Sequence, residues 1–409
     1  MNEAAIAERI ARESYGRLLA LLTSRTRDVA AAEDALAEAF AAALSVWPRT
    51  GAPARPEAWL FAAAKRKLID AARRAQTARA GEAQILLDIE AMEAGVGQSE
   101  APDHRLGLMF ACAHPGIDRP VRTPLMLQTV LGFSAERIAA AFLVEPAAMS
   151  QRLVRAKKKI AEAGVAFDIP EAGEWPLRLE AVLEAIYAAF SEGWSDAEGA
   201  DPDRRALAEE AIWLARVLLT QTPDEPEALG LLALMLHLEA RRAARRVDGR
   251  FVPLDQQDVR LWRAPLQAEA EALLRHAARA GRAGRFQFEA AIQSAHAARR
   301  GRGAADWAAV VTLYDGLCAL SPSPVVLLNR AAAIARRDGP EAGWAVLEAL
   351  QAPALRSYQP FWALRADLLA RLGRAAEARI AYDEAIARER DPAVIRFLSE
   401  RRAALAGVD

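Results

Sequence analysis

The stretch DVAAAEDALAEAFAAALSVW, residues 28–47, carries the clearest helical pattern of the chain. Its apolar residues recur every three or four positions, which places them on one side of an α-helix. They are Val29, Ala32, Leu36, Ala39, Phe40, Ala43, Leu44 and Trp47. The helix is expected to start near Asp28 and to stop at Pro48. Such an amphipathic helix needs partners that cover its apolar side.

Two further helical patterns flank this stretch. Residues 4–22 keep near-helical apolar spacing, and a third pattern follows Pro56 after the proline-rich loop 48–56. The third pattern contains Trp59 and Leu60 and ends in a basic run. We therefore predict a compact three-helix unit over residues 1–80.

Composition indicates an all-α protein and excludes several classes. The chain has 409 residues, 53% apolar and 26% charged, with 53 basic against 54 acidic residues and a net charge of -1. A chain with this share of apolar residues can bury a sizeable core, which excludes global disorder. There is no apolar run long enough to span a membrane, no signal-peptide core and no cofactor motif. Two cysteines exclude a disulfide framework, so a cytoplasmic location is expected.

The near-neutral total hides local charge clusters. All five lysines fall in two basic runs, one over residues 65–74 and one over residues 152–159. Between them, residues 81–103 hold six acids and no base. Clusters of this kind neutralise phosphates, whereas the alternative is that each run is a solvated helix face.

A second helical unit is predicted over residues 105–163, and its end has helix-turn-helix character. Ser134 is a good N-cap, a turn passes Val144, and Pro146 suits the first turn of the next helix. The core-facing residues are expected to be Ile138, Ala139, Phe142, Leu143, Met149, Leu153, Ala156 and Ile160. A second helix with polar tips and bases on its outer face suits the DNA major groove.

The rest of the chain is predicted to be a helical repeat domain. After an acidic linker (81–104) and a short second linker (164–176), residues 177–409 contain hairpin patterns. The clearest begins at Phe361, and its spacing matches the tetratricopeptide repeat. Residues 239–268 interrupt the pattern as an irregular insertion.

The first unit resembles region 2, and the second region 4, of sigma-70-family RNA polymerase sigma factors of the extracytoplasmic-function type. The first resemblance rests on Glu33 and the run Asp34–Phe40, then Ala58-Trp59-Leu60, Ile69-Asp70 and Arg73-Arg74. The second rests on the turn before Pro146 and on Gln151-Arg152-Leu153, Arg155, Ala156 and Lys157. The whole layout looks like the subgroup with a C-terminal tetratricopeptide-like domain.

The resemblance implies a role for each cluster. Contact with the core polymerase β′ clamp helices is implied for Glu33, Asp34 and Glu38, and region 4 would meet the β flap. Binding at the −10 promoter element is implied for Phe61, Lys65, Arg66, Lys67, Arg73 and Arg74. Binding at the −35 element is implied for Ser150, Gln151, Arg152, Arg155, Lys157, Lys158 and Lys159. Trp59 follows the apolar spacing and is expected in the core.

The implied function is that of a non-enzymatic promoter-specificity subunit, regulated from within the chain by its C-terminal domain. The insertion 239–268 and the aromatic residues Tyr358, Phe361 and Trp362 are candidates for an intramolecular contact. The alternatives are a one-component DNA-binding regulator with a helical-repeat sensor and a peptide-binding scaffold. Cys112 and His114 invite a metal interpretation, but a zinc site needs three or four ligands, so no metal is expected.

Overall fold

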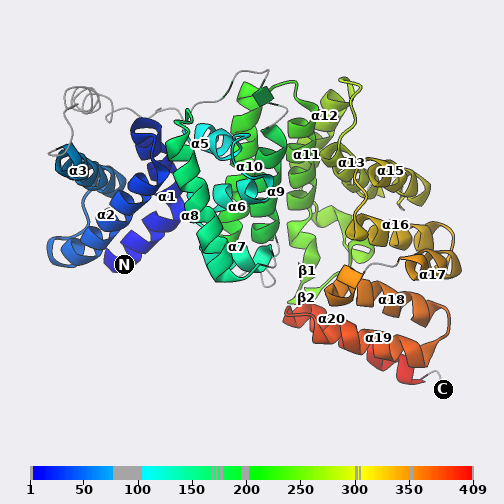
Figure 1. Ribbon diagram of the computed structural model, residues 1–409. Helices are drawn as coiled ribbons and strands as arrows, with labels where there is room; N and C mark the ends of the chain where they lie inside the picture. Colours follow the sequence, from blue (N-terminus) through cyan, green and yellow to red (C-terminus); the bar gives the residue numbers. More distant parts are fainter. Residues whose placement is uncertain are drawn as a thin grey trace. The chain divides into compact units, whose positions relative to one another are not determined.

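The computed structural model describes residues 3–76, 104–142, 144–167, 170, 174–175, 178–194, 202–299, 303, 305–350 and 353–407. The described chain is almost entirely helical and has one short β-hairpin, so the all-α prediction is confirmed (Figure 1). It divides into two compact units, Met1–Ala189 and Phe190–Asp409. The acidic segment predicted over residues 81–103 lies outside the described residues.

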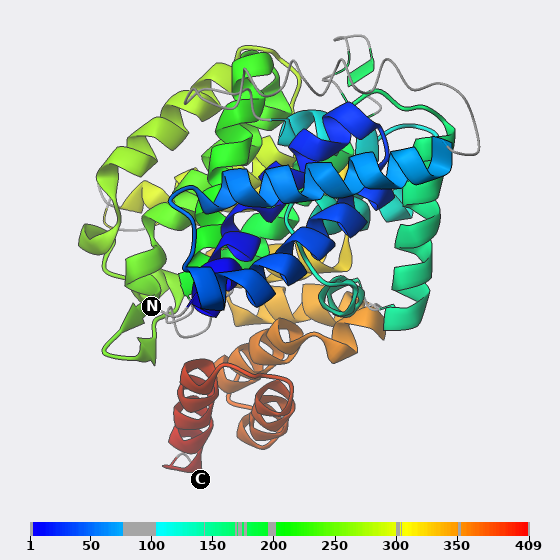
Figure 2. The ribbon, with the colours of Figure 1, turned by 90° about the vertical axis from the view of Figure 1, so that its left-hand side faces the viewer.

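Three helices form the first part of unit 1, namely α1 (Glu3–Thr26), α2 (Val29–Thr50) and α3 (Pro56–Gln76). Figure 2 shows these three helices in shades of blue. The predicted apolar side of α2 packs into their common core, where Leu36 and Trp47 are fully buried, whereas Leu44 is 51% exposed. Asp28 caps α2, because its carboxylate accepts a hydrogen bond of 3.0 Å from the Ala31 amide.

The end of α2 differs from the prediction. Pro48 lies inside the helix, which continues to Thr50. Pro48 has no amide hydrogen to donate to the Leu44 carbonyl, and only two further residues of the helix follow it. The helix ends where Gly51 takes a φ of 78°, a left-handed conformation, and donates its amide to the Trp47 carbonyl at 2.9 Å.

The second part of unit 1 contains α5 (Arg105–Cys112), α6 (Arg119–Thr129), α7 (Ala135–Ala141) and α8 (Pro146–Glu162). Ser134 accepts a hydrogen bond of 3.2 Å from the Arg137 amide at the start of α7. The predicted inner residues Met149, Leu153, Ala156 and Ile160 of α8 are buried. Phe142 was expected in the core but is 38% exposed, because α7 ends at Ala141; Leu143 lies outside the described residues.

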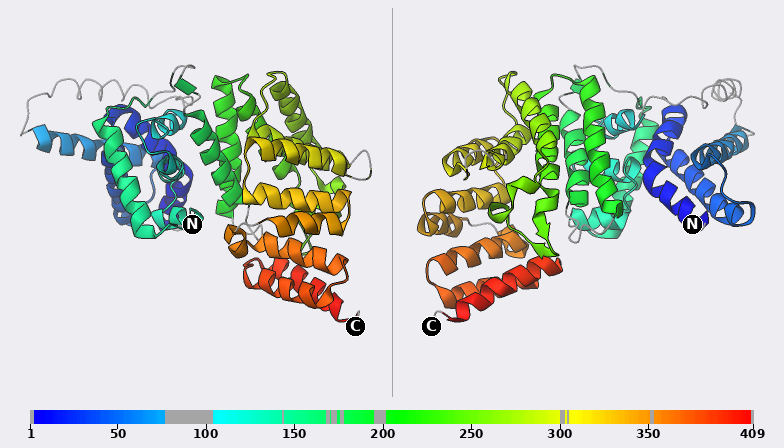
Figure 3. Two further views of the ribbon diagram at one scale, coloured as in Figure 1. Left: turned by 45° about the vertical axis from the view of Figure 1, so that its right-hand side comes forward. Right: turned by 180° about the vertical axis from the view of Figure 1, so that it is seen from behind.

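Helix α9 (Leu179–Trp194) spans the division between the units, and the helices of unit 2 follow it. The first group of helices in unit 2 is α10 (Pro202–Gln221), α11 (Pro226–Ala240), α12 (Ala264–Ala278) and α13 (Arg285–Ala297). Its second group is α15 (Trp307–Leu320), α16 (Pro324–Arg337), α17 (Pro340–Ala349), α18 (Gln359–Arg371), α19 (Ala375–Ala387) and α20 (Pro392–Ala403). Short 3-10 helices are η2 (Arg242–Arg245), η3 (Leu254–Gln256), η4 (Val259–Leu261), η5 (Pro353–Ser357) and η6 (Ala404–Gly407). Figure 3 shows the second group as successive stacked layers.

The insertion 239–268 contains the hairpin of β1 (Arg246–Val247) and β2 (Arg250–Phe251). Its two turn residues, Asp248 and Gly249, both have positive φ, as a tight hairpin turn requires. Arg246 forms an ion pair with Asp391, the N-cap of α20, and the Phe251 and Phe397 ring centroids are 5.5 Å apart. The insertion is therefore irregular as predicted, and this hairpin packs within unit 2 against α20.

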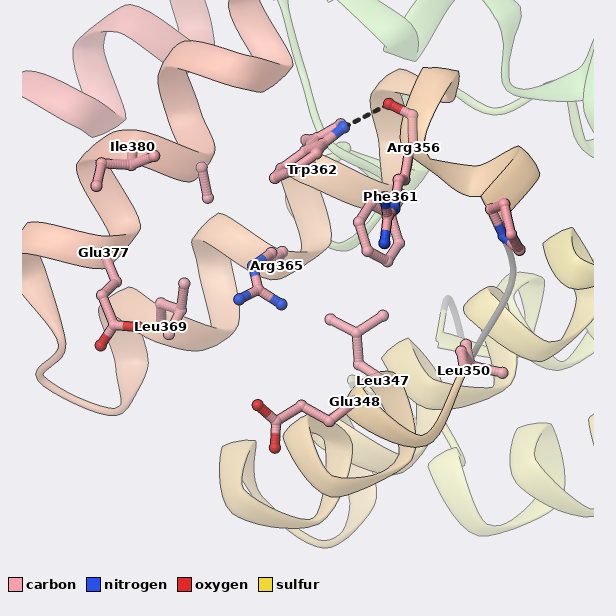
Figure 4. Close-up of a pocket in the computed structure, with 12 residues that line it drawn as sticks. Leu347, Glu348, Leu350, Arg356, Phe361, Trp362, Arg365, Leu369, Glu377 and Ile380 are labelled. Atoms are coloured by element: carbon pink, nitrogen blue, oxygen red, sulfur yellow. Dashed lines mark hydrogen bonds between the residues drawn. The ribbon is translucent and has the colours of Figure 1, made fainter.

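The predicted repeat around Phe361 corresponds to the hairpin of α18 and α19. Its small and aromatic spacing residues Ala366, Ala378, Tyr382 and Ala385 are buried. A hollow of about 1120 Å³ lies beside it, lined by residues of α17, α18 and α19 (Figure 4). Trp362 lines this hollow, and its indole donates a hydrogen bond of 2.8 Å to the Arg356 carbonyl.

Candidate nucleic-acid interface

The basic run of α3 lies on the side of the helix away from the core. Leu60 and Ala64 are fully buried, whereas Arg66 and Lys67 are exposed and Lys65 is half-buried. The spacing produces this division, because apolar residues at positions 60, 61 and 64 share one helical side. The exposed side is a positively charged surface that can bind phosphates.

The two aromatic residues of α3 both belong to the core. Trp59 packs edge-on against Trp47, with ring centroids 5.5 Å apart, as expected from its spacing. Phe61 is only 5% exposed, which corrects its prediction as a residue open to DNA. The reason is that α1 and α2 cover both neighbouring sides of α3. The side chains of Arg73 and Arg74 lie outside the described residues.

The three acidic residues of α2, Glu33, Asp34 and Glu38, differ in burial. Asp34 and Glu38 are exposed and lie one turn apart. Glu38 forms a surface ion pair of 2.8 Å with Lys67 of α3, and both side chains remain about half exposed. Exposed pairs of this kind contribute little stability, so these side chains can exchange partners.

The outer side of α8 presents a mixed surface. At 100° per residue, Gln151, Val154, Arg155 and Lys158 point away from the buried residues, and Ser150 is exposed at the edge. Val154 is 59% exposed. An exposed apolar side chain between polar and basic ones suits contact with a base edge that carries a methyl group. The prediction from sequence did not include Val154, although it falls outside the apolar spacing of its helix.

Arg152 and Lys159 lie on the flank of α8 that faces α6. With Arg155 they line a hollow of about 500 Å³, whose other side includes Asp118 and Val121 at the start of α6. The Lys159 ammonium is 3.5 Å from the Asp118 carboxylate, and both side chains are largely exposed. The hollow thus gathers two arginines and a lysine beside one carboxylate.

Lys157 does not lie on the outer side of α8, which corrects its predicted placement. It is 8% exposed and forms an ion pair with Glu33 of α2. Burial raises the pKa of Glu33, and Lys157 acts in the opposite direction. The pair thus joins one predicted polymerase contact to one predicted DNA contact.

The Cys112 and His114 side chains are engaged separately. The Cys112 sulfur is 3.5 Å from the Thr129 hydroxyl in the core, whereas His114 accepts a hydrogen bond of 3.1 Å from the Gly116 amide. In the part of the chain that the structure describes, no group of three or more histidine, cysteine or acidic side chains could hold a metal ion. The described helices also include none long and apolar enough to cross a membrane.

Two family models match the chain. Sigma-70 region 2 matches residues 10–78, which cover most of α1 to α3. A family of unknown function (DUF6596) matches residues 178–278, which cover α9 to α12. The second match falls in the part where tetratricopeptide-like repeats were predicted, and it supplies no function for that part.

Comparison with curated proteins identifies a relative over most of the chain. The uncharacterized protein R00370 of Rhizobium meliloti (strain 1021) is 42% identical over 369 residues, which is 88% of this chain and 86% of the relative. No solved structure matches the chain.

Proposed function

Since the chain belongs to the sigma-70 family and shares a family with the Rhizobium meliloti relative, we propose that it directs core RNA polymerase to promoters that carry −10 and −35 elements. The observation that carries the proposal is the region 2 match, because it covers most of the bundle of α1 to α3. Region 2 implies interaction with core RNA polymerase and promoter DNA. The finer assignment to the extracytoplasmic-function type, and a cytoplasmic location, are part of the proposal.

Within region 2, the basic side of α3 is assigned to −10 DNA. Exposed Arg66 and Lys67, together with half-buried Lys65, support this assignment. Exposed Asp34 and Glu38 of α2 are assigned to core polymerase, and their surface position leaves both carboxylates within reach of a partner.

Within the proposed region 4, α8 is assigned to the −35 element. Its outer side is assigned to base edges and its flank toward α6 to backbone phosphate. Gln151 and Arg155 carry donors that can bond two atoms of one base edge, and Val154 can contact a thymine methyl group. Arg152 and Lys159, on the flank with the hollow, are assigned to backbone phosphate.

The C-terminal unit is assigned a regulatory role within the chain. Its separation as a compact unit and its stacked helical hairpins support this role. Its likeness to tetratricopeptide repeats rests on the spacing around the α18–α19 hairpin and stays a proposal.

In vitro transcription with core RNA polymerase and a pool of randomised promoters tests the proposal. The full chain should produce specific transcripts, and their start sites should reveal the −10 and −35 elements. A double charge reversal, Asp34→Lys with Glu38→Lys, should abolish them, whereas a reversal at exposed Glu341 of α17, Glu341→Lys, is the control. Specific DNA binding by the chain alone, without transcripts or core binding, would favour the one-component regulator.

The same assay examines the C-terminal unit. A chain of residues 1–177, which lacks α9 together with the C-terminal unit, is compared with the full chain. Higher activity of the shorter chain would identify the C-terminal unit as an inhibitor. Loss of activity, with helicity retained by circular dichroism, would identify it as a required part. Equal activity would refute the regulatory role.

A further inference from the structure

The hollow between α17 and the α18–α19 hairpin has a mostly apolar lining (Figure 4). Its buried part includes Leu347, Leu369 and Ala381, each at most 2% exposed. Ile380 also lines it and is 63% exposed, although it is a large aliphatic side chain. The volume of about 1120 Å³ is sufficient for a drug-sized molecule, since sites for such ligands occupy about 300–1,000 Å³.

Two aromatic side chains of α18 form one wall of the hollow. Phe361 and Trp362 pack edge-on, with ring centroids 5.4 Å apart. The indole nitrogen of Trp362 donates its hydrogen bond of 2.8 Å to the Arg356 carbonyl, so the polar atom of this side chain is already satisfied within the protein. The wall therefore offers apolar ring surface to a ligand.

Two arginines stack on the same tryptophan beside the hollow, but only one of them has a carboxylate. The guanidinium carbons of Arg365 and Arg374 each lie 4.7 Å from the centroid of the Trp344 ring. A stacked guanidinium keeps its in-plane N–H donors for a planar carboxylate. Arg374 donates two hydrogen bonds of 2.7 Å to Glu377. Among the described residues, Arg365 has no ion pair and no side-chain hydrogen bond.

The charged residues around the hollow leave one positive charge over. Arg356, Arg365 and Arg374 stand against Glu348 and Glu377. The hydrogen bonds from Arg374 lower the pKa of Glu377, and the charge of Arg365 acts in the same direction without a direct contact. Figure 4 shows the Arg365 guanidinium directed into the hollow. A ligand with one negative charge would complete this set.

We propose that the hollow binds a small monocarboxylate with an apolar body, and that the Arg365 guanidinium receives the carboxylate as Arg374 receives Glu377. The apolar body would lie against the aromatic wall and the buried leucines, where it removes apolar surface from water. All of the residues involved belong to unit 2, so the inference does not depend on the proposed role in transcription.

Isothermal titration calorimetry of the full chain tests the site with two probes, dodecanoate below its micelle concentration and naphthoate. The uncharged amide of each acid is the ligand control. At least one of the acids should bind once per chain, and its amide should bind roughly tenfold more weakly or worse, because the amide loses the charge-assisted hydrogen bonds. Binding of only one acid would support the site and identify the body as a chain or a ring system.

Arg365→Met should weaken binding of the acid by roughly tenfold or more and leave the amide unaffected. Arg396→Met, at an exposed position of α20 that does not line the hollow, is the control and should change neither. Arg365→Lys keeps the charge but loses the fork, so its affinity should fall between those of the unmodified chain and Arg365→Met.

Ile380→Asp guards against a variant that merely misfolds, because the position is exposed. It places a negative charge at the hollow and should weaken the acid more than the amide, with helicity by circular dichroism unchanged. Equal affinity for acid and amide would overturn the proposal. So would equal affinity of the Arg365→Met and Arg396→Met chains for the acid, or failure of both acids to bind the full chain.

Discussion

Replacement of Phe61 by alanine distinguishes a core residue from a DNA-contacting one. Phe61 is 5% exposed and packs with Leu60 and Ala64 in the core of α1 to α3. A buried phenylalanine contributes about 150–250 Å² of apolar area, which at about 25 cal/mol per Å² corresponds to roughly 4–6 kcal/mol. Measured losses for Phe→Ala in cores are about 3–5 kcal/mol. We expect a loss near 4 kcal/mol, confined to region 2.

Hydrogen exchange of the full chain, followed by mass spectrometry, is the suitable assay, because a two-unit chain need not unfold in one step. A loss of about 4 kcal/mol should speed exchange in α1 to α3 by roughly a thousandfold, since about 1.4 kcal/mol corresponds to a factor of ten. Arg66→Ala, on the exposed side of the same helix, is the control and should leave protection unchanged. If Phe61→Ala kept its protection and lost only −10 DNA contact, the assignment to the core would be refuted.

Three further predictions concern α8 and unit 2. Val154→Ala should relax the preference at one −35 base pair by about 1 kcal/mol, whereas Lys158→Ala should weaken all sequences alike and lower the salt slope by about one; quantitative binding of the polymerase complex to a promoter library separates the two, and a uniform effect of Val154→Ala would contradict base contact. Asp391→Ala removes the N-cap of α20 and its ion pair with the hairpin, so the free energy of opening that hydrogen exchange reports for α20 should fall by about 2 kcal/mol. Unaltered protection of α20 would contradict the role of the hairpin. Burial lowers the pKa of His237 and of His296 to about 4. Both must charge on unfolding, so stability should be full above pH 6.5 and fall toward pH 4 by on the order of 3 kcal/mol for each histidine, and urea unfolding that is equal at pH 7 and pH 4.5 would contradict this.

Local patterns determined the helices of unit 1 well. The Ser134 cap and the inner side of α8 appear as expected, and so does the apolar spacing of residues 28–47 apart from Leu44. These features depend on residues within about one turn of each other, so a sequence displays them directly. Even so, the exact end of α2 could not be read from Pro48, because the helix runs two residues past the proline and ends where Gly51 takes a positive φ.

Residue type alone did not decide which charged and aromatic residues face outward. Lys157 has the same chemistry as Lys158, and only the packing of α8 against α2 buries the first beside Glu33. Phe61 is buried because α1 and α2 pack against α3.

The sequence by itself determined the helical class of this protein, its region 2 and the clusters of charge that suit a partner with phosphates. Tertiary structure alone decided which of those charges are free for such a partner, because burial at a helical position depends on chain that is far away in sequence. The Glu33–Lys157 pair spans 124 residues, and the hairpin at Arg246 meets Asp391 across 145. The apolar periodicity of one helix does not indicate which distant segment will pack against it.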